Sequence, residues 1–111
     1  MHAFDVLRVP ARRRILELLS NGERSSGEVV TAIHNEFGLS QPAVSQHLGV
    51  LRDNGFTSVR SDGTRRIYAL EPERFAEIDA WLESFRGLWI ESLESLAKEV
   101  ERGKRERGGK Q

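Results

Sequence analysis

A polar helix face between Leu39 and Gly55 carries side chains suited to hydrogen bonding with the edges of nucleic-acid bases. Val44, Leu48 and Leu51 recur at the spacing of a buried helical stripe, which turns the other side of the same helix to solvent. A glutamine amide can donate to and accept from adenine, a serine hydroxyl can serve either kind of edge, and an arginine can bind guanine or phosphate. Each outward residue alone would also fit an ordinary solvated face, but together they favour base recognition. The outward positions hold Gln41, Pro42, Ser45, Gln46, Gly49 and Arg52.

Local signals delimit this helix and place another helix just before it. Ser40 is a suitable N-cap, Pro42 falls in the first turn, and Asn54-Gly55 ends the segment. His47 lies at the edge of the polar face, where a DNA contact and a packing role are both open. The two helices are separated by at most three residues, so the sequence predicts a helix-turn-helix with its second helix at about residues 40–53. The preceding stretch has an apolar stripe that stops at Gly38, a typical left-handed terminator, and consists of Val29, Val30, Ile33 and Phe37.

After Gly55 the pattern changes to that of two strands joined by a tight turn. Residues 56–60 and 64–70 are rich in β-branched and aromatic side chains and flank Ser61-Asp62-Gly63. Arginines at the tip would protect a strand edge by charge and contact DNA, and both roles can hold at once. This order of elements predicts a mainly α-helical winged helix-turn-helix. Its second helix would enter the major groove, and the hairpin, the wing at about residues 56–70, would reach adjacent DNA. The candidate DNA contacts of the wing are Arg60, Thr64, Arg65 and Arg66.

The two ends of the chain carry more apolar side chains than a small domain can bury alone. Residues 10–23 predict a helix, and residues 3–9 predict a short amphipathic piece in front of it. From Pro72 to Val100 apolar residues recur every three or four positions, with Gly87 as a place for a kink or a division. We expect two copies to pack these segments together as a homodimer. The predicted dimer interface consists of Phe4, Leu7, Ile78, Trp81, Leu82, Phe85, Trp89 and Leu93.

The composition limits the class of protein. The chain has 111 residues, 38% of them hydrophobic and 31% charged, with no cysteine and no apolar run long enough for a membrane span. We expect residues 1–103 to form one domain with its C-terminal dimerisation helix, and residues 104–111 to form a disordered basic tail. The lack of cysteine and of an apolar leader favours a cytoplasmic location. The net charge is zero, but 9 of the 17 acidic side chains lie between residues 71 and 101, so a basic face elsewhere remains compatible with DNA binding.

These motifs resemble the ArsR family of bacterial winged-helix repressors. The resemblance is carried by PARRRILELLSNGE (10–23), LSQPAVSQHLGVLRDNGF (39–56) and RSDGTRRIYAL (60–70), and it extends over about residues 3–100. The late stretch IDAWLESFRGLWIESLESLAKEV resembles the C-terminal helices of the SdpR-like branch, which lacks the family's usual metal sites. The resemblance implies a homodimeric repressor of a palindromic operator, often that of its own gene. It also implies DNA contacts by Gln41, Ser45, Gln46 and His47 of the helix and by Arg65 and Arg66 of the wing.

The chain departs from metal-sensing members of that family where their ligands would lie. Residues 25–29 take the place of a Cys-x-Cys pair and contain no thiol. Asp79 and Glu83 lie four residues apart on the terminal helix, but no histidine follows His47. The stretch TAIHNEFG is also a few residues longer than the usual pattern, which affects where the turn starts. We therefore expect no metal site and no cofactor.

Two other functions stay open beside that of a DNA-binding repressor. A small molecule at the aromatic dimer seam, near Trp81, Phe85 and Trp89, would make the chain a ligand-responsive regulator. A foreign helix on the same seam would make it a protein-interaction module. An enzyme is not expected, because the sequence has no nucleophile elbow, phosphate loop or paired-histidine motif. The expected partners are double-stranded DNA and a second copy of the chain, with a small-molecule effector left open and no membrane.

Overall fold

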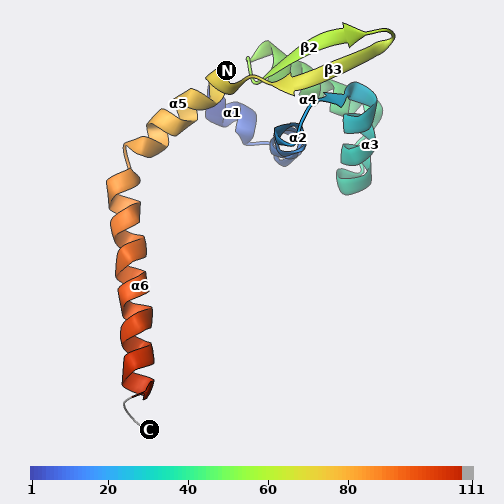
Figure 1. Cartoon of the computed structure of the whole chain (residues 1–111). Coiled ribbons are helices and arrows are strands. Elements are labelled where there is room, and N and C mark those ends of the chain that lie inside the picture. Colours follow the sequence, from blue (N-terminus) through green and yellow to red (C-terminus); the bar gives the residue numbers. More distant parts are fainter. Residues whose placement is uncertain (109–111) are drawn as a thin grey trace. The chain divides into compact units, whose positions relative to one another are not determined.

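The computed structural model describes residues 1–108, which form six helices and three strands (Figure 1). They divide into two units, Met1–Ile78 and a second unit from Asp79 onward. The predicted architecture, mainly helical with an antiparallel β-hairpin, is confirmed. None of the helices in this part of the chain is long and apolar enough to cross a membrane. In chain order the elements are α1 (Ala3–Leu7), α2 (Pro10–Ser20), β1 (Arg24–Ser25), α3 (Ser26–Phe37), α4 (Gln41–Asp53), β2 (Thr57–Asp62), β3 (Arg65–Leu70), α5 (Pro72–Glu83) and α6 (Arg86–Gly108).

The turn between α3 and α4 is built as the sequence predicts. Gly38 ends α3 in the left-handed conformation, with φ 71° and ψ 16°, and donates its N–H to the carbonyl oxygen of His34 at 2.8 Å. The Ser40 hydroxyl oxygen accepts the N–H of Ala43 at 3.3 Å and caps α4, whose first turn also holds Pro42. Three residues therefore join the two helices, and the start of α4 is fixed by side-chain capping as well as by packing.

The buried side of α4 anchors it in the core of the first unit. Val44, Leu48 and Leu51 are at most 1% exposed, which confirms the predicted inward stripe. Burying one such side chain contributes about 1.5–3 kcal/mol, so this face fixes how α4 is rotated about its axis. The outward face of α4 follows from that rotation. The surrounding core includes Ile15 and Leu19 of α2, Val29 and Ile33 of α3, Phe56, and Tyr68 of β3.

The hairpin loop is one residue shorter than the sequence predicts, and it includes Thr64, which was expected in the second strand. Its register runs from Thr57↔Leu70 to Asp62↔Arg65, so Ser61 and Asp62 are paired strand residues rather than part of the turn. The loop is Gly63-Thr64, with Gly63 at φ 64°. A two-residue loop with a positive φ at its first position matches the right-handed twist of the strands better than a longer turn does.

A third strand, β1, was not predicted. Arg24 and Ser25 pair with Tyr68 and Ile67 of β3, which gives the antiparallel order β1-β3-β2. The strand follows directly after residues 10–23, where a helix was expected; α2 itself ends at Ser20, and Gly22 has φ 140°. β1 therefore joins the middle of β3 to the segment that leads into α3.

The second unit contains the end of α5 and all of α6. The expected division falls at Ser84-Phe85, two residues before Gly87, where the Ser84 hydroxyl donates to the carbonyl oxygen of Trp81 at 2.6 Å. α6 continues to Gly108 and so extends into residues 104–108, where a disordered tail was expected. The rest of the expected tail, residues 109–111, lies outside the described residues.

Candidate nucleic-acid interface

The outer face of α4 presents hydrogen-bonding side chains that the protein itself does not use. Gln41, Ser45 and Gln46 are exposed. Within the described chain, none of the three makes a side-chain hydrogen bond or an ion pair. Their donors and acceptors are therefore available to a ligand in the free protein. The N-terminal half of the helix, where all three lie, is the part that reaches base edges when a recognition helix enters the major groove.

His47 is tied to α2 through one ring nitrogen. Its Nδ1 atom accepts a hydrogen bond from Nε of Arg12 at 3.2 Å, and the side chain is half-buried. Burial lowers the pKa of His47, and the Arg12 charge lowers it further. The neutral ring therefore links α4 to α2, which is the packing role that the sequence left open beside a DNA contact.

Arg52, at the C-terminal end of α4, is held by its neighbour. Its Nε and Nη2 atoms donate to Oδ1 of Asp53 at 3.2 and 3.1 Å. Such a surface ion pair contributes only about 0–1 kcal/mol. A phosphate group can therefore replace the carboxylate at little cost.

The three arginines of the wing differ in their surroundings. Nη2 of Arg60 lies 2.7 Å from a carboxylate oxygen of Glu23, and Nη2 of Arg65 lies 3.1 Å from one of Glu28. The register places Arg60 and Arg65 on one face of the hairpin and Arg66 on the opposite face. Arg66 is exposed and has no ion pair or hydrogen bond from its side chain among the described residues. Thr64 is exposed in the loop at the tip.

The sequence did not reveal Arg12, Glu23 or Glu28 as part of this region. Only Glu28 had a signal in the sequence, because Ser25 and Glu28 have the spacing of a capping box. The structure contains that capping box at the start of α3. Arg12 and His47 are 35 residues apart, and Arg60 and Glu23 are 37 apart. Nothing local indicates such pairs.

The residues predicted for a dimer interface fall into two groups. Leu7 and Ile78 are half-buried and pack against the core of the first unit, where Phe4 is 39% exposed. In the second unit every predicted interface residue is exposed, from 44% at Phe85 to 53% at Leu93. The other large apolar side chains exposed in the described part of this unit are Leu88, Ile90, Leu96 and Val100. An isolated chain would leave this apolar surface in water, which is unusual for a monomer.

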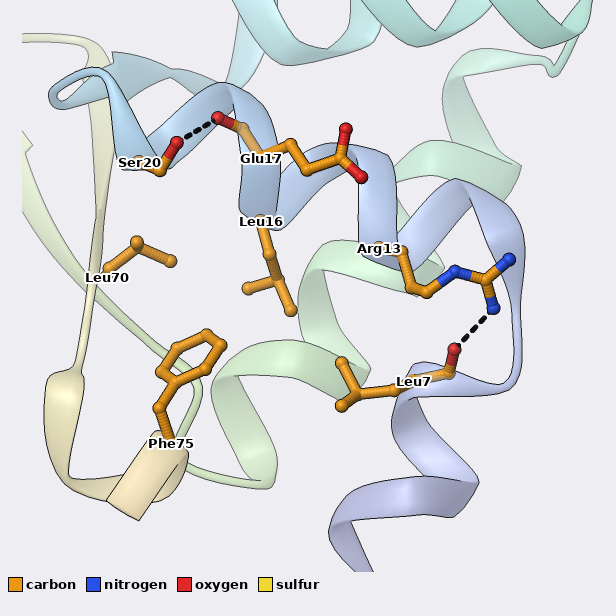
Figure 2. Close-up of a pocket in the computed structure, with 7 residues that line it drawn as sticks. All are labelled: Leu7, Arg13, Leu16, Glu17, Ser20, Leu70 and Phe75. Carbon is orange, nitrogen blue, oxygen red and sulfur yellow. Dashed lines mark hydrogen bonds between the residues drawn. The ribbon is translucent and has the colours of Figure 1, made fainter. Parts of the chain in front are cut away.

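A shallow apolar hollow of about 300 Å³ lies elsewhere in the first unit. Leu7, Leu16, Leu70 and Phe75 surround it, and Figure 2 shows the Leu16 side chain directed between those of Leu7 and Phe75. Arg13 lies at its edge and donates to the carbonyl oxygen of Leu7 at 2.7 Å. Glu17 and Ser20 of α2 also line it, and Leu70 is the last residue of β3. The outward residues of α4 and the wing arginines do not line it.

The order α3, tight turn, α4 and antiparallel hairpin, with an unoccupied polar face on α4, defines a winged helix-turn-helix protein. A family model described as "Bacterial regulatory protein, arsR family" matches residues 9–59. The HTH-type transcriptional regulator Rv2034 of Mycobacterium tuberculosis is 34% identical over 99 residues, which cover 89% of this chain and 86% of that protein. The chain belongs to the ArsR family of bacterial transcriptional regulators, as its motifs predicted.

Other relatives and solved structures agree with this assignment. The transcriptional repressor SdpR of Bacillus subtilis is 27% identical over 84 residues, covering 76% of this chain and 89% of SdpR. The regulator Rv0081 of M. tuberculosis is 43% identical over 75 residues, and this match spans 68% of the chain but only 63% of the relative's length.

Two solved structures share the fold. The crystal structure of an ArsR family transcriptional regulator has a TM-score of 0.65 and 31% identity, covering 78% of this chain and 84% of that one. A solution structure from Mycobacterium bovis, described as the homodimeric winged helix-turn-helix DNA-binding domain of Mb0332, has a TM-score of 0.57 and 29% identity, covering 75% and 73%.

Proposed function

We propose that this protein is a homodimeric transcriptional repressor that binds a palindromic operator. α4 would lie in the major groove and the β2–β3 wing on adjacent DNA. The observation that carries the proposal is the outer face of α4. There Gln41, Ser45 and Gln46 are exposed and bond to no other described residue through their side chains, while the opposite face is buried in the core. Among the relatives, SdpR is described as a transcriptional repressor, which supports repression as the outcome of binding.

The second unit supports the homodimer. Trp81, Phe85, Trp89 and Leu93 expose apolar surface that a second copy would cover. The similar Mb0332 domain is described as homodimeric. A dimer with two-fold symmetry presents two recognition helices related by that symmetry, so its operator is expected to be a palindrome with half-sites one helical turn apart or a multiple of it.

In the wing, Arg66 is the arginine best placed to bind phosphate. It is exposed and has no acidic partner among the described residues, whereas Arg60 and Arg65 are both paired. A phosphate contact carries no sequence information but adds salt-dependent affinity. Arg66 and Gln46 therefore take different parts in binding, and this difference can be measured.

The test is to select tight-binding duplexes from a random library and compare variants on the selected duplex and on a scrambled one. Gln46→Ala is expected to weaken binding to the selected duplex by about 1–3 kcal/mol with little effect on the scrambled one. Arg66→Ala is expected to weaken both and to flatten the slope of log K against log salt by about one unit. Equal losses on both duplexes for Gln46→Ala would contradict base recognition by α4.

Ligand-responsive regulation is a second candidate, favoured by one feature of the second unit. The rings of Trp81 and Phe85 lie 4.9 Å apart between centroids and are about half-exposed, so they offer an aromatic surface to a small molecule. Quenching of tryptophan fluorescence by a ligand that also releases the DNA would support the ligand-responsive function.

Autoregulation is tested separately, by measuring binding to the DNA upstream of the protein's own gene. A protein-interaction module would instead bind DNA weakly and without dependence on the DNA sequence.

A further inference from the structure

Two acidic side chains from outside the hairpin neutralise two of the three wing arginines. Glu23, between α2 and β1, pairs with Arg60, and Glu28, in the first turn of α3, pairs with Arg65. The pairs join residues that are 37 positions apart. Glu23 precedes the helix-turn-helix and Glu28 lies in its first helix, so the pairs connect the wing to that motif and to the segment before it.

Glu28 is held in place from several sides. Its Oε1 atom accepts hydrogen bonds from the backbone N–H of Ser25 at 3.2 Å, from the Ser25 hydroxyl at 3.0 Å and from Nη2 of Arg65 at 3.1 Å. Its Oε2 atom lies 3.9 Å from Nη1 of Arg24. The hydrogen bonds from Ser25 hold the pKa of Glu28 below its usual value, and Arg65 and Arg24 lower it further. Glu28 therefore stays charged at neutral pH and faces Arg65 in a fixed orientation.

We propose that Glu23 and Glu28 limit the phosphate contacts of the wing and so reduce its sequence-independent affinity for DNA. This inference rests on the proposed function of DNA binding by α4 and the wing. A phosphate must displace a carboxylate to bind the paired arginine fully, and the carboxylate itself repels the DNA backbone. Each arginine that neutralises a phosphate releases counterions and steepens the dependence of affinity on salt, so a paired arginine contributes less than a free one.

The consequence for function concerns the search for an operator. Sequence-independent binding comes almost entirely from phosphate contacts, and a genome offers an excess of non-operator sites. A wing with three free arginines would increase the share of protein held on those sites. Among the described residues, Glu23 and Glu28 leave Arg66 as the wing arginine without an acidic partner, so the wing keeps one free phosphate contact while its total affinity for DNA stays limited.

Glu28→Gln is the informative substitution, because glutamine can keep the capping box of α3 while the charge opposite Arg65 is lost. Binding to a mixed-sequence duplex is measured between about 50 and 200 mM salt for the wild type and for this variant. We expect affinity to rise about two- to fivefold, the range for release from an exposed ion pair. The slope of log K against log salt is expected to steepen by up to about 0.9. Glu23→Gln is expected to behave in the same way through Arg60.

Two controls separate release of an arginine from the change in net charge. Glu73→Gln alters the net charge equally, and Glu73 has no ion pair or hydrogen bond from its side chain among the described residues. Its effect on the slope is expected to be smaller than that of Glu28→Gln. In an Arg65→Ala background, Glu28→Gln is expected to have no more effect than Glu73→Gln. Urea unfolding of each variant shows whether the fold is retained.

The outcomes distinguish this inference from the proposed function. If the wild type binds no duplex, the proposed function fails. If the wild type binds DNA but Glu28→Gln leaves affinity and slope unchanged, or weakens binding while the fold is retained, the inference alone is overturned. Weaker binding would mean that the carboxylates hold Arg60 and Arg65 in position for DNA.

Discussion

Replacing Gly38 with alanine tests whether a left-handed residue sets the turn of the helix-turn-helix. Gly38 has φ 71°, and a Cβ atom built there meets no other atom within 4 Å, so the cost of alanine is conformational rather than steric. Alanine in this conformation is less stable by about 1–2 kcal/mol. Its lower entropy in the unfolded chain offsets about 0.4–1 kcal/mol of that. The expected net loss in the free energy of unfolding is therefore about 1 kcal/mol.

Urea unfolding at one fixed protein concentration measures this loss, with two further variants as comparisons. Gly49 lies within α4 without a positive φ and also has open space at its Cβ position, so Gly49→Ala is expected to stabilise by up to about 1 kcal/mol. Gly38→Asn is expected to lose less than Gly38→Ala, because asparagine tolerates the left-handed region. The reasoning would be refuted if Gly38→Ala were as stable as the wild type, or if alanine at both positions had the same effect.

Two other predictions concern the His47 ring and the second unit. Because the pKa of His47 is lowered in the folded chain, the unfolded chain binds more protons as the pH falls below about 6.5, and the free energy of unfolding is expected to fall there. His47→Asn keeps an acceptor for Arg12 but does not titrate. Urea unfolding of this variant from about pH 8 to about pH 5 should therefore show a free energy of unfolding that depends less on pH than that of the wild type. An unchanged pH dependence would rule out His47 as its source. Trp89→Asp is expected to dissociate the dimer in sedimentation velocity, since it would bury an unpaired charge at a cost of about 3–5 kcal/mol. Lys98→Gln is the control, because it changes the net charge equally on the other side of α6, and it should leave the dimer intact. If the Trp89→Asp variant remained dimeric, Trp89 would be excluded from the interface.

The helix-turn-helix could be predicted because its signals are local. Helical spacing placed Val44, Leu48 and Leu51 inward, and the structure buries all three. Gly38 and Ser40 marked the end of one helix and the start of the next, as the dihedral angles and the cap confirm. Each of these features depends on residues at most a few positions apart, so a single sequence contains the information.

The features that were missed depend on residues far apart or on very short segments. β1 has two residues, too few to show the alternation of a strand. Two ion pairs, Arg60 with Glu23 and Arg65 with Glu28, form only in the folded chain, where the hairpin packs beside α3. With 17 basic and 17 acidic side chains, the sequence allows many other pairings and does not indicate these two. The basic tip was therefore predicted as one feature, whereas the structure distinguishes paired from unpaired arginines.

Sequence-specific DNA binding by the exposed face of α4 is tested most directly by one ratio of affinities. The affinity of the wild-type protein for the duplex selected from a random library is divided by its affinity for a scrambled duplex of equal length and composition, at the same salt concentration. Recognition through Gln41, Ser45 and Gln46 predicts a ratio of at least about 10³. A ratio near one, with strong binding to both duplexes, would show that the protein binds the DNA backbone alone and would contradict recognition by this face.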